Sequence, residues 1–144
     1  ILEEKYGVAA DVWSITSYKE LRRDGLESER WNMLHPGEPA RVPYITRMLK
    51  DEPGVMVAAS DYMKLLPDSI SRWFPRPLMA LGTDGFGRSE SREALREFFE
   101  VDARFVTLAT LTALEAEKKI KSSVISQAIK DLNIDPDKSD PVTS

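Results

Sequence analysis

Three short apolar segments, each followed by residues of helical character, constrain the fold of this chain more than any other feature. They are residues 9–16 (AADVWSIT), 55–59 (VMVAA) and 78–81 (LMAL). Strands separated by helical segments favour an α/β sandwich with a largely parallel sheet. Because a parallel strand needs neighbours, we also expect at least one strand of the domain to precede Ile1.

Two signals locate the first long helix. Ser17 and Glu20 have capping-box spacing, in which the hydroxyl and the carboxylate each accept a free amide at a helix start. We therefore expect a helix over about residues 18–24. The pair Asp24-Gly25 is a helix-breaking signal, and we expect the helix to be interrupted there.

The second half of the chain is expected to be mainly helical. Either Ser89 or Ser91 can cap one helix, and Asp102 can cap the next. Residues 134–144 hold three aspartates and two prolines, a composition that favours a loose tail. We therefore expect one domain over residues 1–133, followed by a flexible acidic tail.

Helical patterns also occur at both ends of that domain. Leu2 and Tyr6 share one side of a short helix that Gly7 can end, so we expect the sequence to begin inside a longer element. The apolar stripe of residues 123–132 predicts the last helix, which Asn133 can end.

Composition excludes several classes of protein. The chain of 144 residues has 20 Lys and Arg against 24 Asp and Glu, a formal charge of −4, with no cysteine and one histidine. These counts exclude thiol catalysis and a structural zinc site, and they argue against bulk attraction to nucleic acid. No apolar run approaches the roughly 20 residues that cross a bilayer. No signal peptide is recognisable either, so we expect a cytoplasmic protein.

The single histidine, His35, is the only candidate for a general base near neutral pH. A nucleophilic serine would need this imidazole at hydrogen-bond distance, and Ser14, Ser17 and Ser28 are the serines to consider. The chain has no nucleophile-elbow motif. The pattern therefore favours a histidine at a helix end or an interface over a catalytic one.

The segment 82–89 (GTDGFGRS) leaves a predicted strand and enters a helix, where free amides and an arginine would suit a phosphate or carboxylate. Its spacing matches neither of the common phosphate-binding motifs, and Asp84 would repel an anion. A tight turn, or close packing against another chain, is the favoured interpretation. The candidate residues for an interface or an anion site are Gly85, Gly87, Arg88, Ser89 and Arg92.

Three long strings are more specific than any of these motifs: RWNMLHP, SDYMK and GTDGFGRSESRE, within residues 6–36, 40–64 and 81–111. Together they resemble the C-terminal domain of the homodimeric bacterial pyruvate dehydrogenases. The resemblance covers nearly the whole chain. It implies a three-layer αβα sandwich of the transketolase C-terminal type, with a small, mostly parallel sheet whose first strand lies before Ile1.

The resemblance also implies a reaction and its partners. Such enzymes decarboxylate pyruvate on thiamine diphosphate with magnesium, and they transfer the acetyl group to lipoyl groups of the acetyltransferase component. Their cofactor-binding groups lie in two upstream domains, and no motif of those groups matches this chain. We therefore assign no catalytic, cofactor-binding or metal-binding residue here and expect the chain alone to be inactive.

The role that remains is that of a scaffold. The expected partners are the enzyme's own N-terminal and pyrimidine-binding domains, the second subunit of a homodimer and the acetyltransferase component. In this interpretation the glycine-rich loop faces a neighbouring domain or subunit, where Arg88 and Arg92 pair with acidic groups. The alternative is a stand-alone binding module that uses the loop for an anionic ligand or a peptide.

Overall fold

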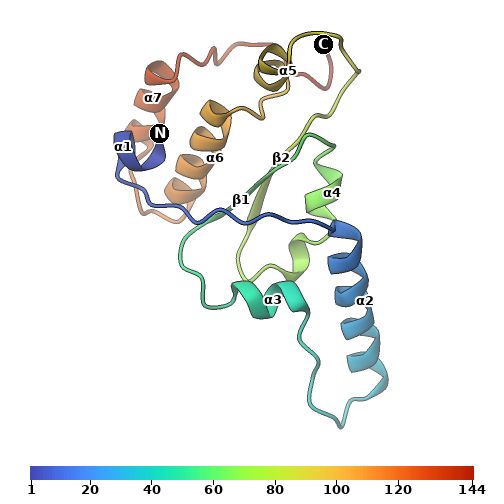
Figure 1. The fold of residues 1–144 in the computed structure, drawn as a ribbon. Coiled ribbons are helices and arrows are strands. Elements are labelled where there is room, and N and C mark those ends of the chain that lie inside the picture. The colour runs from blue at the N-terminus through green and yellow to red at the C-terminus, as the bar shows by residue number, and fades with distance from the viewer.

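The computed structural model describes residues 1–144 and shows helices arranged around a small parallel sheet (Figure 1). The strands are β1 (Met56–Ala59) and β2 (Leu78–Leu81). The helices are α1 (Leu2–Tyr6), α2 (Tyr18–Leu34), α3 (Tyr44–Leu49), α4 (Leu65–Asp68), the 3-10 helix η1 (Ser71–Trp73), α5 (Arg92–Phe98), α6 (Ala103–Ala116) and α7 (Ser122–Asp131). The α/β class expected from the sequence is confirmed.

The two strands pair in parallel, with Met56 opposite Leu78 and Ala59 opposite Leu81. Both strands coincide with apolar segments that the sequence singled out. The connection between them passes through α4 and η1, as a parallel pair requires. Helix α6 packs against both strands and α4 contacts β2, so helices cover the sheet (Figure 1).

The strand predicted over residues 9–16 is not formed. In Figure 1 this segment is extended and runs from α1 to α2 without joining the sheet. Val12 is 96% exposed and Trp13 is 51% exposed. A strand needs a neighbouring backbone to accept and donate its hydrogen bonds, and an apolar pattern alone does not supply that neighbour. The prediction of a third strand is therefore wrong for this structure.

The predicted interruption of the first long helix is also wrong. Helix α2 continues through Asp24-Gly25 to Leu34, and Ser17 caps it by accepting the amide of Glu20 at 3.3 Å. Gly25 is buried inside the helix, and a Cβ atom there would overlap the indole ring of Trp73. This glycine serves a close helix contact rather than a turn, because only glycine lets the ring approach the helix backbone so closely.

Two apolar clusters hold the chain together. The first joins α3 and η1 to α2 through Ile45, Leu49, Ile70 and Trp73, with Tyr18 and Leu21 packed against them. The second joins α6 and α7 through Leu111, Ala128 and Leu132, and it also takes Leu2 and Tyr6 of α1. Helix α1 thus lies on the C-terminal helices, and Gly7 ends it with a φ of 65°, as predicted.

The predicted caps of the later helices are confirmed, and the structure decides between Ser89 and Ser91. Ser91 rather than Ser89 caps α5, since its hydroxyl accepts the amide of Ala94 at 3.2 Å. Asp102 caps α6 by accepting the amides of Arg104 and Phe105 at 2.9 and 3.1 Å. Asn133 follows the last helix with a φ of 52°, the left-handed conformation that ends helices.

Residues 134–144 contact the body of the protein, and Ile134 packs against the second apolar cluster. Lys138 donates to the carbonyl oxygen of Phe98 at 2.6 Å, and Pro141 is buried. The flexibility of this tail and the domain boundary at residue 133 stay predictions.

The contact between Gly25 and Trp73 gives a first test. In Gly25→Ala the new methyl group must displace the indole ring, and this overpacking costs about 2 kcal/mol of folding free energy in spite of alanine's better helix propensity. The measurement is denaturant unfolding followed by tryptophan fluorescence.

Gly37→Ala is the matched control, because the added methyl group would have no other atom within 4 Å. Its stability should stay within about 0.5 kcal/mol of the parent. Equal stability of the two variants would show that the position of the Trp73 ring does not require glycine at position 25.

Candidate functional site

The glycine-rich loop lies at the carboxyl ends of the two parallel strands, the edge where α/β proteins most often place their functional groups. It is joined there to the loop that follows β1. The amide of Thr83 donates to the carbonyl oxygen of Tyr62 at 2.9 Å, and the amide of Lys64 donates to Asp84 Oδ2 at 3.0 Å. The two loops therefore form one connected edge.

Two residues of the loop have structural explanations. A Cβ atom at Gly82 would lie 2.5 Å from the carbonyl oxygen of Tyr62, so the two loops can pack this closely only with glycine. Asp84 uses its carboxylate to hold the amide of Lys64. Both contacts agree with the interpretation of the loop as a tight turn, and packing of the loop against another chain stays a prediction.

The two candidate glycines differ from each other. Gly85 has a φ of 117°, and a Cβ atom there would overlap the carbonyl oxygen of Pro141 in the C-terminal tail. Gly87 has open space around its Cα. Gly85 is therefore required by conformation and by contact, whereas no contact in the structure requires glycine at position 87.

Arg88 points back onto its own domain. Its guanidinium carbon lies 4.0 Å from the centre of the Phe98 ring, in cation–π contact. Lys138 Nζ lies 5.2 Å from the same ring and 3.1 Å from Glu100 Oε1. Phe98 thus links the loop to the tail, a role for Phe98 and Lys138 that sequence reasoning missed.

Ser89 and Arg92, the other candidates, are both exposed. Neither forms an ion pair or a side-chain hydrogen bond within the chain, and Arg92 is the first residue of α5. Their side chains are therefore free to contact another molecule.

Charged pairs fix α5 relative to its neighbours. Arg104 lies 2.7 Å from Asp102 Oδ2 and 3.0 Å from Glu97 Oε1, which ties α5 to α6. The hydrogen bond from Arg104 to Asp102, and to a smaller extent the one to Glu97, raises the pKa of Arg104 above its ordinary value. Arg96 reaches Asp61 at 3.4 Å, which ties α5 to the loop after β1.

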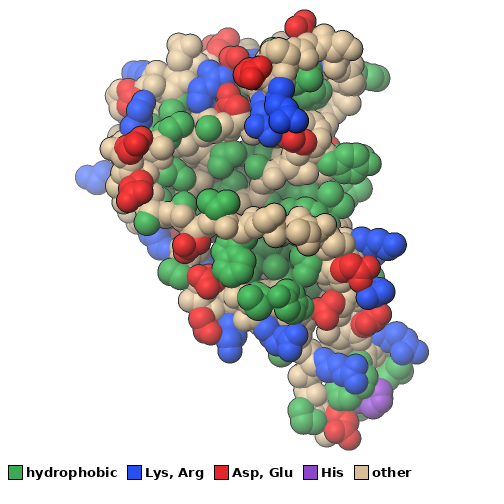
Figure 2. Space-filling view, viewed as in Figure 1, with side chains coloured by type: hydrophobic (Ala, Val, Ile, Leu, Met, Phe, Trp, Pro, Cys, Tyr) green, Lys and Arg blue, Asp and Glu red, His purple; other side chains and the backbone are tan.

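Large apolar side chains on the two loops and at the start of α4 are exposed to solvent. Figure 2 shows hydrophobic side chains over the region of α4 and the end of β2. The exposed fractions are 57% for Tyr62, 38% for Met63, 67% for Leu65 and 79% for Phe86. We call these four residues the edge patch. Apolar groups so exposed on neighbouring loops are typical of surfaces that contact another protein chain.

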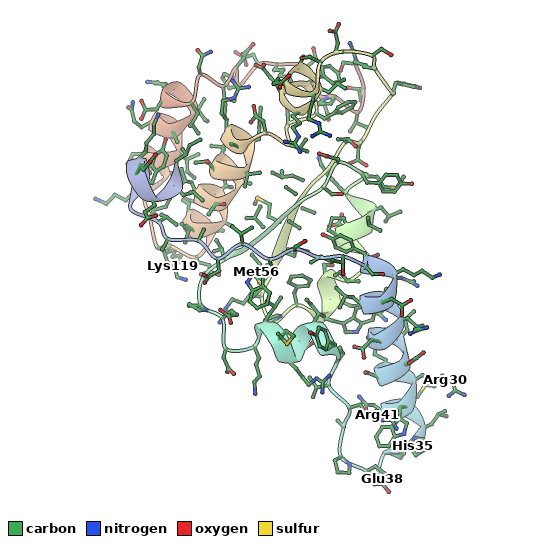
Figure 3. All side chains as sticks on the ribbon, in the orientation of Figure 1. Arg30, His35, Glu38, Arg41, Met56 and Lys119 are labelled. Atoms are coloured by element: carbon green, nitrogen blue, oxygen red, sulfur yellow. The ribbon has the colours of Figure 1, made fainter.

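His35 lies away from this edge, at the far end of α2 and close to Arg41 (Figure 3). Its Nδ1 lies 2.8 Å from the carbonyl oxygen of Trp31, and its ring stacks on that indole at 4.4 Å. The three candidate serines do not meet it: Ser17 caps α2 and Ser28 is buried within it, while Ser14 is in the extended segment. The prediction that His35 ends a helix is confirmed.

No group of three or more histidines and acidic side chains is gathered closely enough to hold a metal ion. None of the helices combines the length and the apolar character that a membrane-crossing helix needs.

A small parallel sheet covered by helices, with a glycine-rich loop at its carboxyl edge, defines the protein as an α/β domain. Residues 1–102 match the family described as the transketolase-like TK C-terminal domain, and the chain belongs to that family. Helices α6 and α7 lie beyond the matched residues.

Curated relatives match almost the whole chain. It is 51% identical over 142 residues to the "Pyruvate dehydrogenase E1 component" of Escherichia coli K12 and 48% identical over 143 residues to that of Pseudomonas aeruginosa. The one from Mycolicibacterium smegmatis is 43% identical over 135 residues. These matches cover 98%, 99% and 94% of this chain but only 16%, 16% and 14% of the relatives. The expected resemblance to the C-terminal region of these enzymes is confirmed.

The contact between Gly85 and the tail gives a second test. Gly85→Ala forces a side chain into a backbone conformation that favours glycine and against Pro141, which costs about 1–3 kcal/mol locally. We expect faster hydrogen exchange at the amides of residues 138–140 and of Val142, measured by mass spectrometry.

Gly87→Ala is the control, since space is open there. It should leave the exchange of the tail unchanged. If Gly85→Ala also leaves that exchange unchanged, the loop does not hold the tail.

Proposed function

We propose that this chain is the C-terminal structural and dimer-interface domain of a pyruvate dehydrogenase. In this proposal the whole enzyme decarboxylates pyruvate and transfers the acetyl group to lipoyl groups of an acetyltransferase component. The observation that carries the proposal is the 51% identity over 98% of the chain to a pyruvate dehydrogenase E1 component. The matched stretch of 142 residues includes the glycine-rich loop and the helices beyond it.

The surface of the chain supports a role in assembly. Val12 and Trp13 in the extended segment and the four residues of the edge patch expose apolar area that another chain could cover. The sheet has only two strands, and each strand has an unpaired edge. Two parallel strands are few for a buried sheet, and open edges favour pairing with further strands.

The cofactors belong to the same proposal. Thiamine diphosphate supplies the chemistry that stabilises the carbanion formed on decarboxylation, and magnesium accompanies its diphosphate. The chain offers no cluster of potential metal ligands. We assign the binding of both groups to other parts of the enzyme, and we give this chain the task of supporting them. The proposal also includes a cytoplasmic location for the enzyme.

The first experiment measures the activity of the full-length protein that carries this chain. With pyruvate, thiamine diphosphate and Mg²⁺ it should release carbon dioxide, and with a lipoylated acetyltransferase component it should form acetyl-dihydrolipoyl groups. Omission of thiamine diphosphate is the control. A folded full-length protein that binds the cofactor but does not decarboxylate pyruvate would contradict the proposal.

The second experiment separates assembly from chemistry at the glycine-rich loop. Arg88→Ala removes an exposed guanidinium that lies on the Phe98 ring, and Arg92→Ala removes an exposed cation; neither cation has an ion pair within this chain, so each is free to pair with an acidic group of the second subunit. Each should weaken dimerisation of the full-length enzyme by about tenfold, the effect of losing one charged interface pair. Turnover per dimer should change much less. Sedimentation and turnover measured at one protein concentration give both values.

Lys130→Ala is the matched control, because Lys130 is exposed on α7 and forms no ion pair in the chain. It should leave dimerisation within about twofold of the parent. Normal dimerisation with a collapsed turnover number in Arg88→Ala would mean that the loop acts in the chemical step.

A further inference from the structure

The last residues of the chain fold into two similar turns. Asp135-Pro136 and Asp140-Pro141 each place an aspartate and a proline at the first two positions of a turn, where these residue types are favoured. Asp135 Oδ1 accepts the amide of Asp137 at 2.9 Å, and Asp140 Oδ1 accepts the amide of Val142 at 2.9 Å. Two of the three aspartates of this segment therefore shape its backbone.

Lys138 lies between the two turns and is anchored at the end of α5. Its Nζ donates to the carbonyl oxygen of Phe98 at 2.6 Å and lies 3.1 Å from Glu100 Oε1. The same nitrogen lies 5.2 Å from the centre of the Phe98 ring and 5.8 Å from that of Phe105. The side chain of Lys138 is only 24% exposed. Its charge therefore acts within the chain rather than in solvent.

The end of α5 depends on this lysine for one hydrogen bond. The last four carbonyl groups of a helix have no partner inside the helix. In α5 the carbonyl oxygens of residues 95–97 accept the amides of residues 99–101. The fourth, that of Phe98, accepts no backbone amide, and Lys138 is its donor. A cation at this position is also favoured by the helix dipole.

The second anchor of the segment lies on the glycine-rich loop. Pro141 is buried, and its carbonyl oxygen lies so close to Gly85 that a Cβ atom there would overlap it. Arg88 of the same loop and Lys138 both lie on the Phe98 ring. The tail thus contacts residues 85–98 at both of their ends.

Few other contacts hold α5 in place. None of its residues is buried. Ion pairs join Arg96 to Asp61 and Glu97 to Arg104, but Asp61 is 67% exposed and Glu97 is 60% exposed. Ion pairs with solvent-exposed groups contribute little stability. An element with so few buried groups opens at a low cost in free energy, so the two anchors of the tail matter for its order.

We propose that residues 135–142 form a strap that holds the glycine-rich loop and α5 in the arrangement in which they meet the second subunit. The role of the strap in assembly rests on the dimer-interface function proposed above. Lys138 is a positioning residue: it acts through α5 and not by touching the second subunit. When the strap is released, Arg88 and Arg92 become mobile and fewer molecules are ready to bind. The strap is the alternative to the loose tail that composition favours.

Hydrogen exchange in the full-length protein tests whether the strap holds α5. Lys138→Met keeps the aliphatic part of the side chain but removes its charge and its N–H donors. We expect the amides of residues 94–101 to exchange about tenfold faster, the effect of losing one hydrogen bond to a charged group. Lys138→Arg keeps the charge and the donors, and its exchange should stay close to that of the parent.

Sedimentation of the same variants tests the role in assembly. Lys138→Met should weaken dimerisation about threefold, because the apparent affinity falls with the fraction of molecules in the binding arrangement. Lys138→Arg should restore it. Lys130→Met is the matched control, since it makes the same substitution at an exposed lysine of α7 that forms no ion pair in the chain. It should leave exchange and dimerisation at the values of the parent.

A variant at the other anchor tests whether the segment acts as one unit. Asp140→Ala removes the acceptor for the amide of Val142 and so loosens the turn that places Pro141 on Gly85. It should also speed exchange in α5. In the double variant with Lys138→Met the two free-energy effects should add to less than their sum, because both changes release the same strap. Full additivity would mean two separate contacts and no strap.

Three further results would overturn the proposal. Unchanged exchange in Lys138→Met would show that the tail does not hold α5. Faster exchange with the dimerisation of the parent would show that the interface does not need the strap. Weaker dimerisation with unchanged exchange would mean that Lys138 contacts the second subunit itself. Unchanged thermal unfolding of each variant shows that it is folded.

Failure of the proposed function gives a different result. A full-length protein that stays monomeric at every concentration would contradict the dimer-interface function and, with it, the role of the strap in assembly. The exchange of α5 needs no second subunit. It therefore still decides, in that protein, whether the strap holds α5.

Discussion

The position of Trp73 against α2 is the interaction on which the lower half of this structure depends. Its ring lies directly on the backbone of Gly25, its Nε1 donates to Glu29 at 2.8 Å, and its carbonyl oxygen accepts the hydroxyl of Thr46 at 2.6 Å. One residue thus joins α2, η1 and α3. Because this contact lies in the middle of α2, the second half of the helix projects beyond the core (Figure 1).

Local signals were sufficient where the determining contact is local. β2 is formed by the four apolar residues that the sequence singled out, and the caps at Ser17, Ser91 and Asp102 act within three residues of their own position. The two wrong predictions concern contacts across the chain. The helix continues through Gly25 because a residue 48 positions later packs on it, and residues 9–16 form no strand because no neighbouring strand lies beside them. Tertiary contacts override local propensity in both cases.

The features of the candidate site also divide into those that the sequence predicted and those that it did not. The sequence located the glycine-rich loop at a strand end and favoured a tight turn or close packing against another chain, and the contact of Gly82 with Tyr62 of the same chain agrees with the first of these. The contact of Gly85 with Pro141 has no signal in the sequence beyond the glycine itself. The proximity of Ser28, Arg41 and Arg47 was not predicted at all, because these residues are spread over two helices and their connection. Their proximity results from the packing of α3 on α2.

Net charge is a poor guide to what this surface attracts. The chain carries a formal charge of −4, yet several of its acidic side chains are committed to amides or to arginines of the same chain. A carboxylate that caps a helix or holds a backbone amide contributes less to the field that a partner meets than a free arginine does, because its charge is already compensated at short range. The potential that decides recognition is therefore local.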